Sequence, residues 1–387
     1  MQNHSQKKIV IAAGAFKQSL SAPQAAKAIR RGLMRSGLYA HYIVMPTADG
    51  GNGTLDIFLS NSADSERIEI SVDNPLGRPI KAAYGLIKNR KTAVIEMALA
   101  SGLELLTPEE FDPLRASTYG TGQLMQAALE HGIERLIIGL GGSATVDGGA
   151  GCLQALGIQL LDAQGHPIPR GGGFLEQIVT IDASGLDPRW HHVEIIIASD
   201  VENPTLGPKG AAAVFGPQKG ATPEQVAVLE HNLSHFFDLT HTQHQRDVRH
   251  IQGGGAAGAF AAGLMAYLEG HIESGIDLVL DTAGFDHHLL DADLVITSEG
   301  RIDEQTIDGK GPIGIARRAQ REHVPTIVFV GGLQGDESVL HGAGIAAVIP
   351  ITSRPMALQE ALENAEILLE NAALRTGYLL QIGWQPS

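Results

Sequence analysis

The chain has 387 residues, and its 28 lysines and arginines against 43 aspartates and glutamates give a formal net charge of −15. This balance argues against nucleic acid as the main partner, because binding a phosphate backbone needs a basic face. It still permits a small anionic ligand, since a local site can be positive on an acidic protein. A single cysteine cannot form an internal disulfide, which favours a cytoplasmic protein. No apolar run reaches the ~18 residues of a membrane span, so no membrane partner is expected, and the length predicts two domains.

The two ends of the chain alternate short β-branched runs with helical patterns. Residues 9–13 and 41–45 are typical of strands, and residues 22–36 carry apolar side chains at helical spacing behind Ser21, an expected N-cap. This alternation predicts parallel βαβ units and a doubly wound sheet. Towards the C-terminus the same pattern predicts strands at 293–297, 325–330 and 345–349 and helices at 312–321 and 356–374.

The middle of the chain has a different pattern. Residues 66–72, 80–87 and 92–96 are strand-like and follow one another without a helix between them, which favours antiparallel pairing. After them the pattern predicts helices at 120–131, 223–237 and 256–269 and strands at 135–139, 178–181 and 193–198. We therefore predict an α/β protein in which a doubly wound parallel sheet domain, residues 1–75 and 288–387, is interrupted by a second, mixed α/β domain, residues 76–287.

Glycine accounts for 47 residues, above the typical ~7 % of a chain, and the glycines cluster beside expected strand ends. Such clusters suit places where the backbone must approach a phosphate. Lys17 lies in the turn after the first strand, where it would meet an anion; an exposed loop lysine is the alternative. Asp49, followed by Gly50 after the second strand, would bind a metal–phosphate or a substrate hydroxyl, or form only a tight turn.

The densest glycine cluster spans residues 139–151, directly after an expected strand. It contains the pattern G-x-G-x-x-A, which makes a dinucleotide site one alternative. A helix should then begin inside the motif, whereas residues 145–149 are turn-like. A long loop with many free N–H groups better suits phosphoryl or carboxylate oxygens. The candidate residues of this loop are Gly141, Gly142, Ser143, Thr145 and Asp147.

Two polar segments follow apolar strands further along the chain. Asp200 and Asn203 supply the oxygen ligands that Mg²⁺ prefers. In the second segment an arginine suits a carboxylate and a lysine suits a phosphate, and an exposed loop of ion pairs is the alternative. The charged residues of this second segment are Glu299, Arg301, Asp303 and Lys310.

Two weaker patterns remain open. Residues 253–258 are rich in glycine and open a helix without a preceding strand, which indicates either close helix packing or an anion at the helix N-terminus. His231 and His235 stand four residues apart, as in some zinc sites, but the region is polar and lacks a carboxylate at ligand spacing. A zinc role is therefore the weaker reading of these histidines.

In their order along the chain, these motifs resemble the bacterial glycerate kinase family of the first type. The resemblance covers nearly the whole chain and implies a flavodoxin-like domain interrupted by a second α/β domain. It also implies ATP and Mg²⁺ as cofactors, 2-phosphoglycerate as the usual product and a small hydroxy acid as substrate, and it leaves a homodimer open. The motifs are Phe16-Lys17, Ala48-Asp49-Gly50-Gly51, Ala116-Ser117-Thr118-Tyr119-Gly120-Thr121-Gly122, Gly141-Gly142-Ser143-Ala144-Thr145, Asp147-Gly148-Gly149-Ala150-Gly151, Ser199-Asp200-Val201, Phe215-Gly216-Pro217-Gln218-Lys219-Gly220 and Glu299-Gly300-Arg301-Ile302-Asp303.

The resemblance and the residue types together suggest roles in phosphoryl transfer, a reaction that needs cations, a metal and a base for the acceptor hydroxyl. Asp200 would be that base or a Mg²⁺ ligand together with Glu299, and Lys17 and Arg301 would hold the substrate carboxylate or the transferring phosphate. The expected substrate contacts are Asp49, Gly50, Ser143, Thr145, Asp147 and Asn203. The expected nucleotide or phosphate contacts are Gly141, Gly142, Lys219, Glu299, Asp303 and Lys310.

The sequence departs from the family pattern at several polar positions. The family usually has Asp-Ser where this chain has Gly14-Ala15, Glu where it has Asn52, and Asn where it has Val146. The usual Thr-Gly-Glu-Gly-Arg becomes Thr297-Ser298-Glu299-Gly300-Arg301. Because losing one such group typically costs ~10²–10³ in rate, a changed substrate or reduced activity is expected. A degenerate kinase that only binds a ligand as a metabolite sensor is one alternative, and an NAD-binding dehydrogenase is another.

Overall fold

The computed structural model describes residues 6–16, 18–48, 50–302, 311–334 and 337–384. The chain divides into two compact units: unit 1 comprises residues 1–49 and 276–387, and unit 2 comprises residues 50–275. The first division lies earlier than the boundary expected near residue 75. The reason is that β3 (Ser65–Asp73) pairs antiparallel along its length with β4 (Pro79–Ile87), which holds residues 65–73 in unit 2. The second division also lies earlier than the expected position near residue 288.

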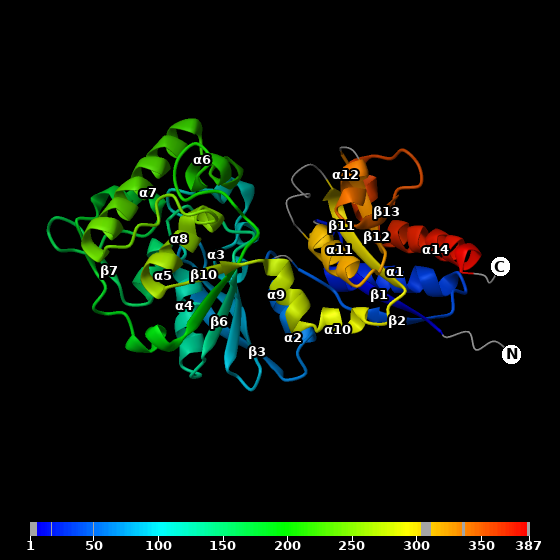
Figure 1. The fold of residues 1–387 in the computed structure, drawn as a ribbon. Helices are drawn as coiled ribbons and strands as arrows, with labels where there is room; N and C mark the ends of the chain where they lie inside the picture. The colour runs from blue at the N-terminus through cyan, green and yellow to red at the C-terminus, as the bar shows by residue number, and fades with distance from the viewer. Residues whose placement is uncertain (1–5, 17, 49, 303–310, 335–336, 385–387) are drawn as a thin grey trace. The chain divides into compact units, whose positions relative to one another are not determined.

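Unit 1 is built on a five-stranded parallel sheet with the strand order β13-β12-β11-β1-β2. Counted within the unit, this is the order 2-1-3-4-5 of flavodoxin-like sheets. Figure 1 shows β11, β12 and β13 side by side. The strands are β1 (Lys7–Ala13), β2 (Ala40–Val44), β11 (Leu294–Ile302), β12 (Thr326–Leu333) and β13 (Ile345–Pro350).

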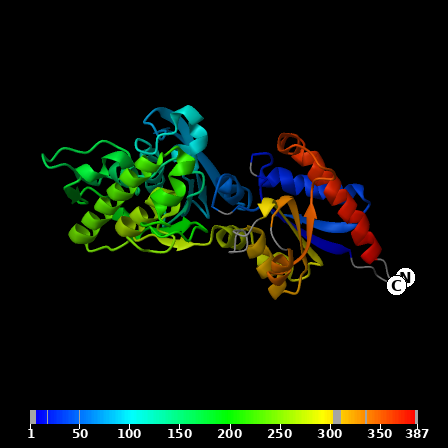
Figure 2. The ribbon, with the colours of Figure 1, turned by 90° about the horizontal axis from the view of Figure 1, so that it is seen from above.

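Helices cover both faces of this sheet. Because successive side chains of a strand point to opposite faces, Ile9 and Ile11 of β1 pack on one side and Val10 packs on the other. The first side is covered by α1 (Ala22–Arg35), which begins with a capping box at Ser21, and by α14 (Ala365–Gly383). The two helices pack against each other, and Figure 2 shows α14 (red) crossing α1 (blue). The remaining helices of unit 1 are α9 (Gly275–Thr282), α10 (Phe285–Leu289), α11 (Gly311–Arg321), α12 (Glu337–Gly342) and α13 (Leu358–Glu363).

The C-terminal helical segment differs from the expected single helix over 356–374. It consists of α13 and α14, with Asn364 between them. The Asn364 side chain donates from Nδ2 to the Glu360 carbonyl oxygen at 2.8 Å and so closes the end of α13. Asparagine competes with the helix for backbone hydrogen bonds, which explains the break.

Unit 2 is built on a six-stranded mixed sheet with the order β10-β9-β6-β5-β4-β3. The strands β5, β6, β9 and β10 run parallel. The strands β3, β4 and β5 pair antiparallel, as the helix-free stretch of sequence predicts. Besides β3 and β4, the strands are β5 (Thr92–Glu96), β6 (Arg135–Gly139), β9 (Glu194–Ala198) and β10 (His271–Glu273), and a separate hairpin is formed by β7 (Gln159–Leu161) and β8 (Thr180–Asp182).

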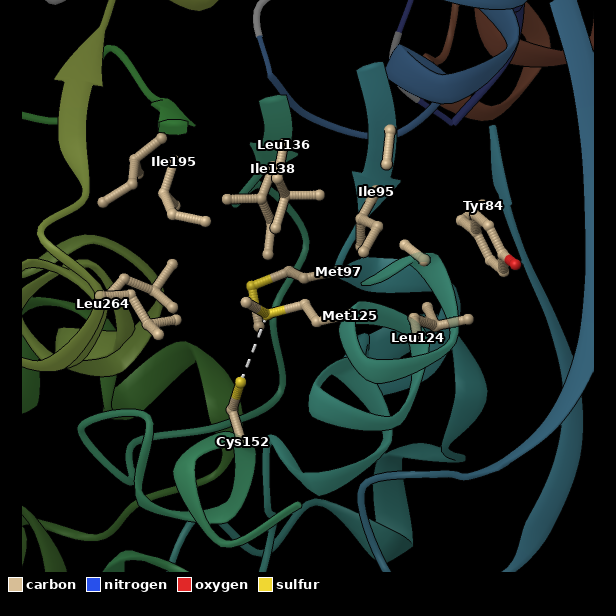
Figure 3. Packing of buried hydrophobic residues seen from close by; sticks show 14 of the residues in the cluster. Tyr84, Ile95, Met97, Leu124, Met125, Leu136, Ile138, Cys152, Ile195 and Leu264 are labelled. Carbon is tan, nitrogen blue, oxygen red and sulfur yellow. Dashed lines mark hydrogen bonds between the residues drawn. The ribbon is translucent and has the colours of Figure 1, made fainter. Parts of the chain in front are cut away.

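The core of unit 2 lies between this sheet and its helices. Figure 3 shows side chains of β5, β6 and β9 packed against those of α4 and α8. Cys152 lies in this core as a buried free thiol, 3.5 Å from Met125 Sδ. The α-helices are α2 (Thr54–Ser60), α3 (Ala98–Ser101), α4 (Tyr119–Leu129), α5 (Ala150–Ala155), α6 (Ala211–Phe215), α7 (Pro223–His244) and α8 (Ala256–Leu268). The 3₁₀ helices are η1 (Leu103–Leu105), η2 (Pro108–Glu110), η3 (Gly172–Gln177), η4 (Pro188–His192) and η5 (Pro217–Lys219).

The predicted fold class is confirmed: a parallel α/β domain is interrupted by a mixed α/β domain. Among the described residues, no helix has the length and apolar character needed to cross a membrane.

Candidate active site

The parallel strands of unit 2 end in register. Glu96 at the end of β5 pairs with Gly139 of β6, Gly139 pairs with Ala198 of β9, and Ala198 pairs with Glu273 of β10. The loops that follow these strands therefore leave the sheet along one edge. In open α/β sheets, ligands bind outside the carboxyl ends of the strands, so this edge is the candidate site of unit 2.

Two glycine-rich turns meet at this edge. The backbone N–H of Gly141 donates to the Gly50 carbonyl oxygen at 3.0 Å. A Cβ atom on Gly141 would lie 2.4 Å from Gly51 Cα, and one on Gly139 would lie 2.7 Å from the Gly50 oxygen. Gly142 has a φ of +76°, which glycine alone adopts without strain. Within the described residues the N–H groups of Gly142 and Ser143 have no hydrogen-bond partner, so they remain donors for an anion.

Glu96 organises the turn before α2, and sequence reasoning missed it. Its carboxylate accepts hydrogen bonds from Gly53 N at 3.1 Å and Leu55 N at 3.2 Å, at the N-terminus of the helix. Burial raises the pKa of this carboxyl, and the hydrogen bonds from Leu55 and Gly53 partly offset that shift. A carboxylate directly after the apolar run 93–95 was the signal that could have identified it.

Replacing Glu96 is expected to loosen this turn. Glu96→Gln exchanges one acceptor oxygen for an amide donor that faces backbone N–H groups, so we expect a loss of about 1–3 kcal/mol in the free energy of unfolding. Urea unfolding measures it. Glu134→Gln is the matched control, because the exposed Glu134 carboxylate forms a surface ion pair with exposed Lys91, and the loss of this pair should cost about 0–1 kcal/mol. Equal effects of the two variants would contradict this role for Glu96.

Asp147 is a fully buried carboxylate inside the loop of residues 141–151. Its Oδ2 accepts from Thr118 N at 2.8 Å, Thr118 Oγ1 at 2.9 Å and Gly151 N at 3.2 Å, and its Oδ1 accepts from Gly149 N at 3.1 Å. Burial raises the pKa of this carboxyl, and these hydrogen bonds lower it in part. The carboxylate therefore ties the loop to the start of α4.

Lys219 lies beneath the same loop. Its ammonium group is buried, with the side chain 2 % exposed, and donates to Ser143 Oγ at 2.8 Å and to the Thr145 carbonyl oxygen at 2.7 Å. Burial lowers the pKa of Lys219 to about 7, against a smaller raising effect of Asp147. Thr145 Oγ1 is also buried and has no partner among the described residues. Lys219 was expected to contact phosphate, and the structure places it against the loop backbone.

The lowered pKa of Lys219 predicts a pH-dependent stability. Between the folded pKa of about 7 and the ordinary value of 10.5, the unfolded chain holds a proton that the folded chain lacks. The stability contribution of this group therefore rises with pH across that window, by at most about 1.4 kcal/mol per pH unit. Denaturant unfolding of the parent and of Lys219→Met from pH 7 to 10 measures the difference. A parent-minus-variant difference that stays flat across this range would contradict the prediction.

Asp200 and Asn203 follow β9 at the same sheet edge. Asp200 Oδ1 accepts from Gly275 N at 3.2 Å, at the first residue of α9. Asn203 donates from Nδ2 to the Lys209 backbone carbonyl oxygen at 2.9 Å. The backbone carbonyl oxygen of Asn203 accepts from Gly255 N at 3.0 Å. The Asp200 carboxylate, the Asn203 amide oxygen and the Ser199 hydroxyl are oxygen ligands of the type that a hard divalent cation binds.

The glycine stretch 253–258 packs directly on the loop. Gly258 accepts through its carbonyl oxygen from Gly148 N at 3.0 Å, and a Cβ atom on Gly258 would lie 2.1 Å from the Thr145 oxygen. Backbone φ values from +54° to +69° at residues 257–259 allow this approach. Of the two alternatives for this stretch, close helix packing accounts for its glycines.

In unit 1, Glu299 and Arg301 lie within a strand. β11 was expected to end at 297 but continues to Ile302, because β12 extends alongside it and pairs Glu299 with Val330 and Arg301 with Gly332. Glu299 Oε1 accepts from Gly300 N at 3.1 Å, and Arg301 donates to Gln334. Four expected site residues lie outside the described residues. They are Lys17 and Asp49, which follow the first two strands, and Asp303 and Lys310, which follow Arg301 in the chain.

Two of the positions expected to depart from the family pattern, Gly14 and Ser298, lie opposite each other in unit 1. Ser298 donates from Oγ to the Gly14 carbonyl oxygen at 2.9 Å, and a Cβ atom on Gly14 would lie 2.7 Å from the Ser298 oxygen. In unit 2, Asn52 donates to Glu104 at 2.8 Å, and Val146 is fully buried in the apolar core. Val146 thus contributes to core packing and offers no ligand group.

The histidine pattern belongs to the packing of α7. His235 Nε2 lies 2.7 Å from the Ile178 oxygen, and His244 Nε2 lies 3.1 Å from the Ile181 oxygen. In the part of the chain that the structure describes, no three His, Cys, Asp or Glu side chains gather closely enough to hold a metal ion by themselves.

The expected residues thus fall into separate groups. Within the loop of residues 141–151, Lys219 donates to Ser143 and Thr145, and Asp147 accepts from Thr118, Gly149 and Gly151. Gly50 packs on this loop, with its carbonyl oxygen accepting from Gly141 N. Asp200 and Asn203 follow the neighbouring strand β9, and Glu299 and Arg301 lie on β11 of unit 1.

Comparison with known proteins bears on what this arrangement does. The model of the glycerate kinase family matches residues 9–381. The glycerate kinase of Bacillus subtilis (strain 168) is 48 % identical over 366 residues, covering 95 % of this chain and 96 % of the relative. The glycerate 2-kinase of Escherichia coli (strain K12) is 44 % identical over 376 residues, covering 97 % and 98 %.

A solved structure agrees with the sequence comparison. A crystal structure described as glycerate kinase 2 from Salmonella typhimurium LT2 matches with a TM-score of 0.85 at 44 % identity, over 99 % of this chain and 100 % of that chain. The motif resemblance is thus confirmed over nearly the full length. The chain therefore belongs to the glycerate kinase family.

Proposed function

We propose that this kinase transfers the γ-phosphoryl group of ATP to glycerate and releases 2-phosphoglycerate. The observation that carries the proposal is the near-complete coverage at 44–48 % identity of relatives named glycerate kinase and glycerate 2-kinase. The glycine-rich loop at the carboxyl edge of the unit 2 sheet supports it, because its N–H groups suit anionic oxygens. The single cysteine, a buried free thiol, is in keeping with a cytoplasmic reaction.

Asp200 is the proposed base for the acceptor hydroxyl or a ligand of the metal. Phosphoryl transfer needs positioning and charge neutralisation more than covalent help from the protein. Lys17 and Arg301 would supply positive charge to the substrate carboxylate or the transferring phosphate, and Asp49 and Glu299 would complete the substrate or metal contacts. Gly142 and Ser143 would donate to anionic oxygens through their N–H groups.

Mg²⁺ fits the donor chemistry of this chain. Asp200 and Asn203 offer carboxylate and amide oxygens after β9, and Glu299 offers a carboxylate on β11, which are the hard ligands that Mg²⁺ takes. When bound with ATP, the ion would neutralise the charge that develops on the phosphoryl oxygens. Asp200 is the proposed protein ligand in unit 2, and Glu299 is the candidate ligand that unit 1 offers.

Asp147 and Lys219 are assigned to the loop rather than to direct ligand contact. Four donors already occupy the Asp147 carboxylate, and two loop acceptors occupy the buried Lys219 ammonium. Both residues would therefore set the shape of the loop that receives the anion.

The test is ADP release by the purified protein with Mg²⁺-ATP, with and without D-glycerate, followed by ³¹P NMR of the product. D-Glycerate-dependent turnover with the resonance of 2-phosphoglycerate is the expected result. A different phosphorylated hydroxyl would overturn the product assignment alone. Ligand binding by calorimetry without turnover would overturn the proposed reaction, and the absence of both would overturn the assignment of the site.

A further inference from the structure

The buried ammonium group of Lys219 has an unusual setting. It is enclosed below the loop of residues 141–147 and donates to two groups of that loop, Ser143 Oγ and the Thr145 carbonyl oxygen. These partners lie 76 and 74 residues away in sequence, so the contact fixes the loop against η5. Burying a lysine ammonium costs free energy, so a lysine buried beneath a loop with free N–H groups calls for a function.

We propose that Lys219 is a positioning residue that turns the Ser143 hydroxyl into a hydrogen-bond donor for an anionic oxygen of the ligand. An ammonium group can only donate, so Ser143 Oγ must accept from Lys219. The hydroxyl hydrogen of Ser143 is then left to point away from Lys219. The proposal deepens the proposed function and rests on it, because it names the group beneath the loop that prepares the loop for an anion.

The same geometry couples anion binding at Ser143 to the protonation of Lys219. Asp147 is the charged side chain that acts on Lys219 from the loop, and it favours the ammonium form. Burial opposes that form, so near neutral pH Lys219 is divided between amine and ammonium. An anionic oxygen bound at Ser143 adds negative charge close to Lys219 and favours the ammonium. Binding of the ligand that contacts the loop should therefore take up a proton.

Calorimetry tests this coupling apart from turnover. D-Glycerate and Mg²⁺-ADP are titrated separately at pH 7 in two buffers of different ionisation heat. We expect an uptake of up to about 0.5 proton with the one ligand whose carboxylate or phosphate contacts the loop. Lys219→Met should abolish that uptake, whereas Lys91→Met, which removes an exposed lysine at the opposite end of β5, should leave it unchanged. Equal uptake by the parent and Lys219→Met would overturn the proposal.

Ser143 variants test the donor and stand even if Lys219→Met does not fold. Ser143→Ala should lower kcat/KM by about 10²–10³-fold for the substrate that contacts the loop, either D-glycerate or Mg²⁺-ATP. Ser143→Thr, which keeps the hydroxyl, should restore most of this kcat/KM. The double variant with Lys219→Met should be no worse than the more impaired single variant. A fully active Ser143→Ala, or independent losses that multiply, would overturn the proposal.

The outcomes also separate this proposal from the proposed function. Normal glycerate phosphorylation by the parent with no Lys219-dependent proton uptake would overturn the positioning role alone. Lys219-dependent uptake with Mg²⁺-ADP, combined with no phosphorylation of glycerate, would support the positioning role and overturn the proposed substrate.

Discussion

Asp200→Asn is expected to lower kcat by about 10²–10⁴-fold, with the fold intact. A positioned base typically contributes this much to a proton transfer, and a lost metal ligand has an effect of similar size. The asparagine oxygen can still accept from Gly275 N, so the hydrogen bond that Asp200 makes to the start of α9 is retained. ADP release with Mg²⁺-ATP and D-glycerate measures kcat, and urea unfolding confirms that the variant folds.

Asp162→Asn is the matched control for this charge removal. Asp162 also accepts backbone N–H groups in a turn after a strand of unit 2, from Gln164 at 2.8 Å and His166 at 2.9 Å, but it lies on the separate β7–β8 hairpin. Its variant should retain the parent's kcat. An Asp200→Asn variant with kcat within threefold of the parent would show that the carboxylate carries neither proposed role.

Asp147→Ala is expected to destabilise the protein by about 3–5 kcal/mol, the cost of breaking a buried charged network by removing one partner. The change leaves the buried N–H groups of Thr118 and Gly149 without an acceptor and removes the negative charge that favours the Lys219 ammonium. The free energy of unfolding in urea measures the loss. The glycine loop should also lose its shape, so the remaining folded protein is expected to turn over slowly.

Asp182→Ala is the control for this second change. Asp182 is half-buried, and the partners described for its carboxylate are groups of Ser184, among them the backbone N–H at 2.9 Å. Its removal should cost less than about 1 kcal/mol, since water can replace the lost acceptor. If Asp147→Ala lost no more stability than Asp182→Ala, Asp147 would not hold the loop.

Strand–helix alternation was enough to predict the parallel sheet of unit 1, because period and β-branched content are local signals. The β3–β4 hairpin was equally local, yet its membership of unit 2 depended on pairing with β5 and so moved the domain boundary. The extension of β11 over Glu299 and Arg301 was also hidden, since it depends on β12 continuing beside it.

The sequence indicates which types of residue gather in the candidate site, but it indicates less well which groups these residues contact. The glycines at 141 and 142 do pack closely, but against Gly51 and Asn52 of the neighbouring turn, and their expected contact with phosphate stays a prediction. The burial of Lys219 was not visible, since a lysine in a glycine-rich loop usually indicates an exposed anion contact. Glu96 was overlooked because a single carboxylate after a strand carries no motif, and its partners lie about forty residues earlier.

The interrupted order of unit 1 has a consequence for folding. Its central pair of strands, β1 and β11, joins Ile9 to Leu294, and all of unit 2 lies between them in the chain. Bringing β1 and β11 together is slow while the chain between them is unfolded, because a long loop must close. Once unit 2 has folded, the flexible chain between the two strands is shorter. Unit 2 should therefore fold first. The two tryptophans, Trp190 in unit 2 and Trp384 in unit 1, give each unit its own fluorescent reporter of that sequence of events.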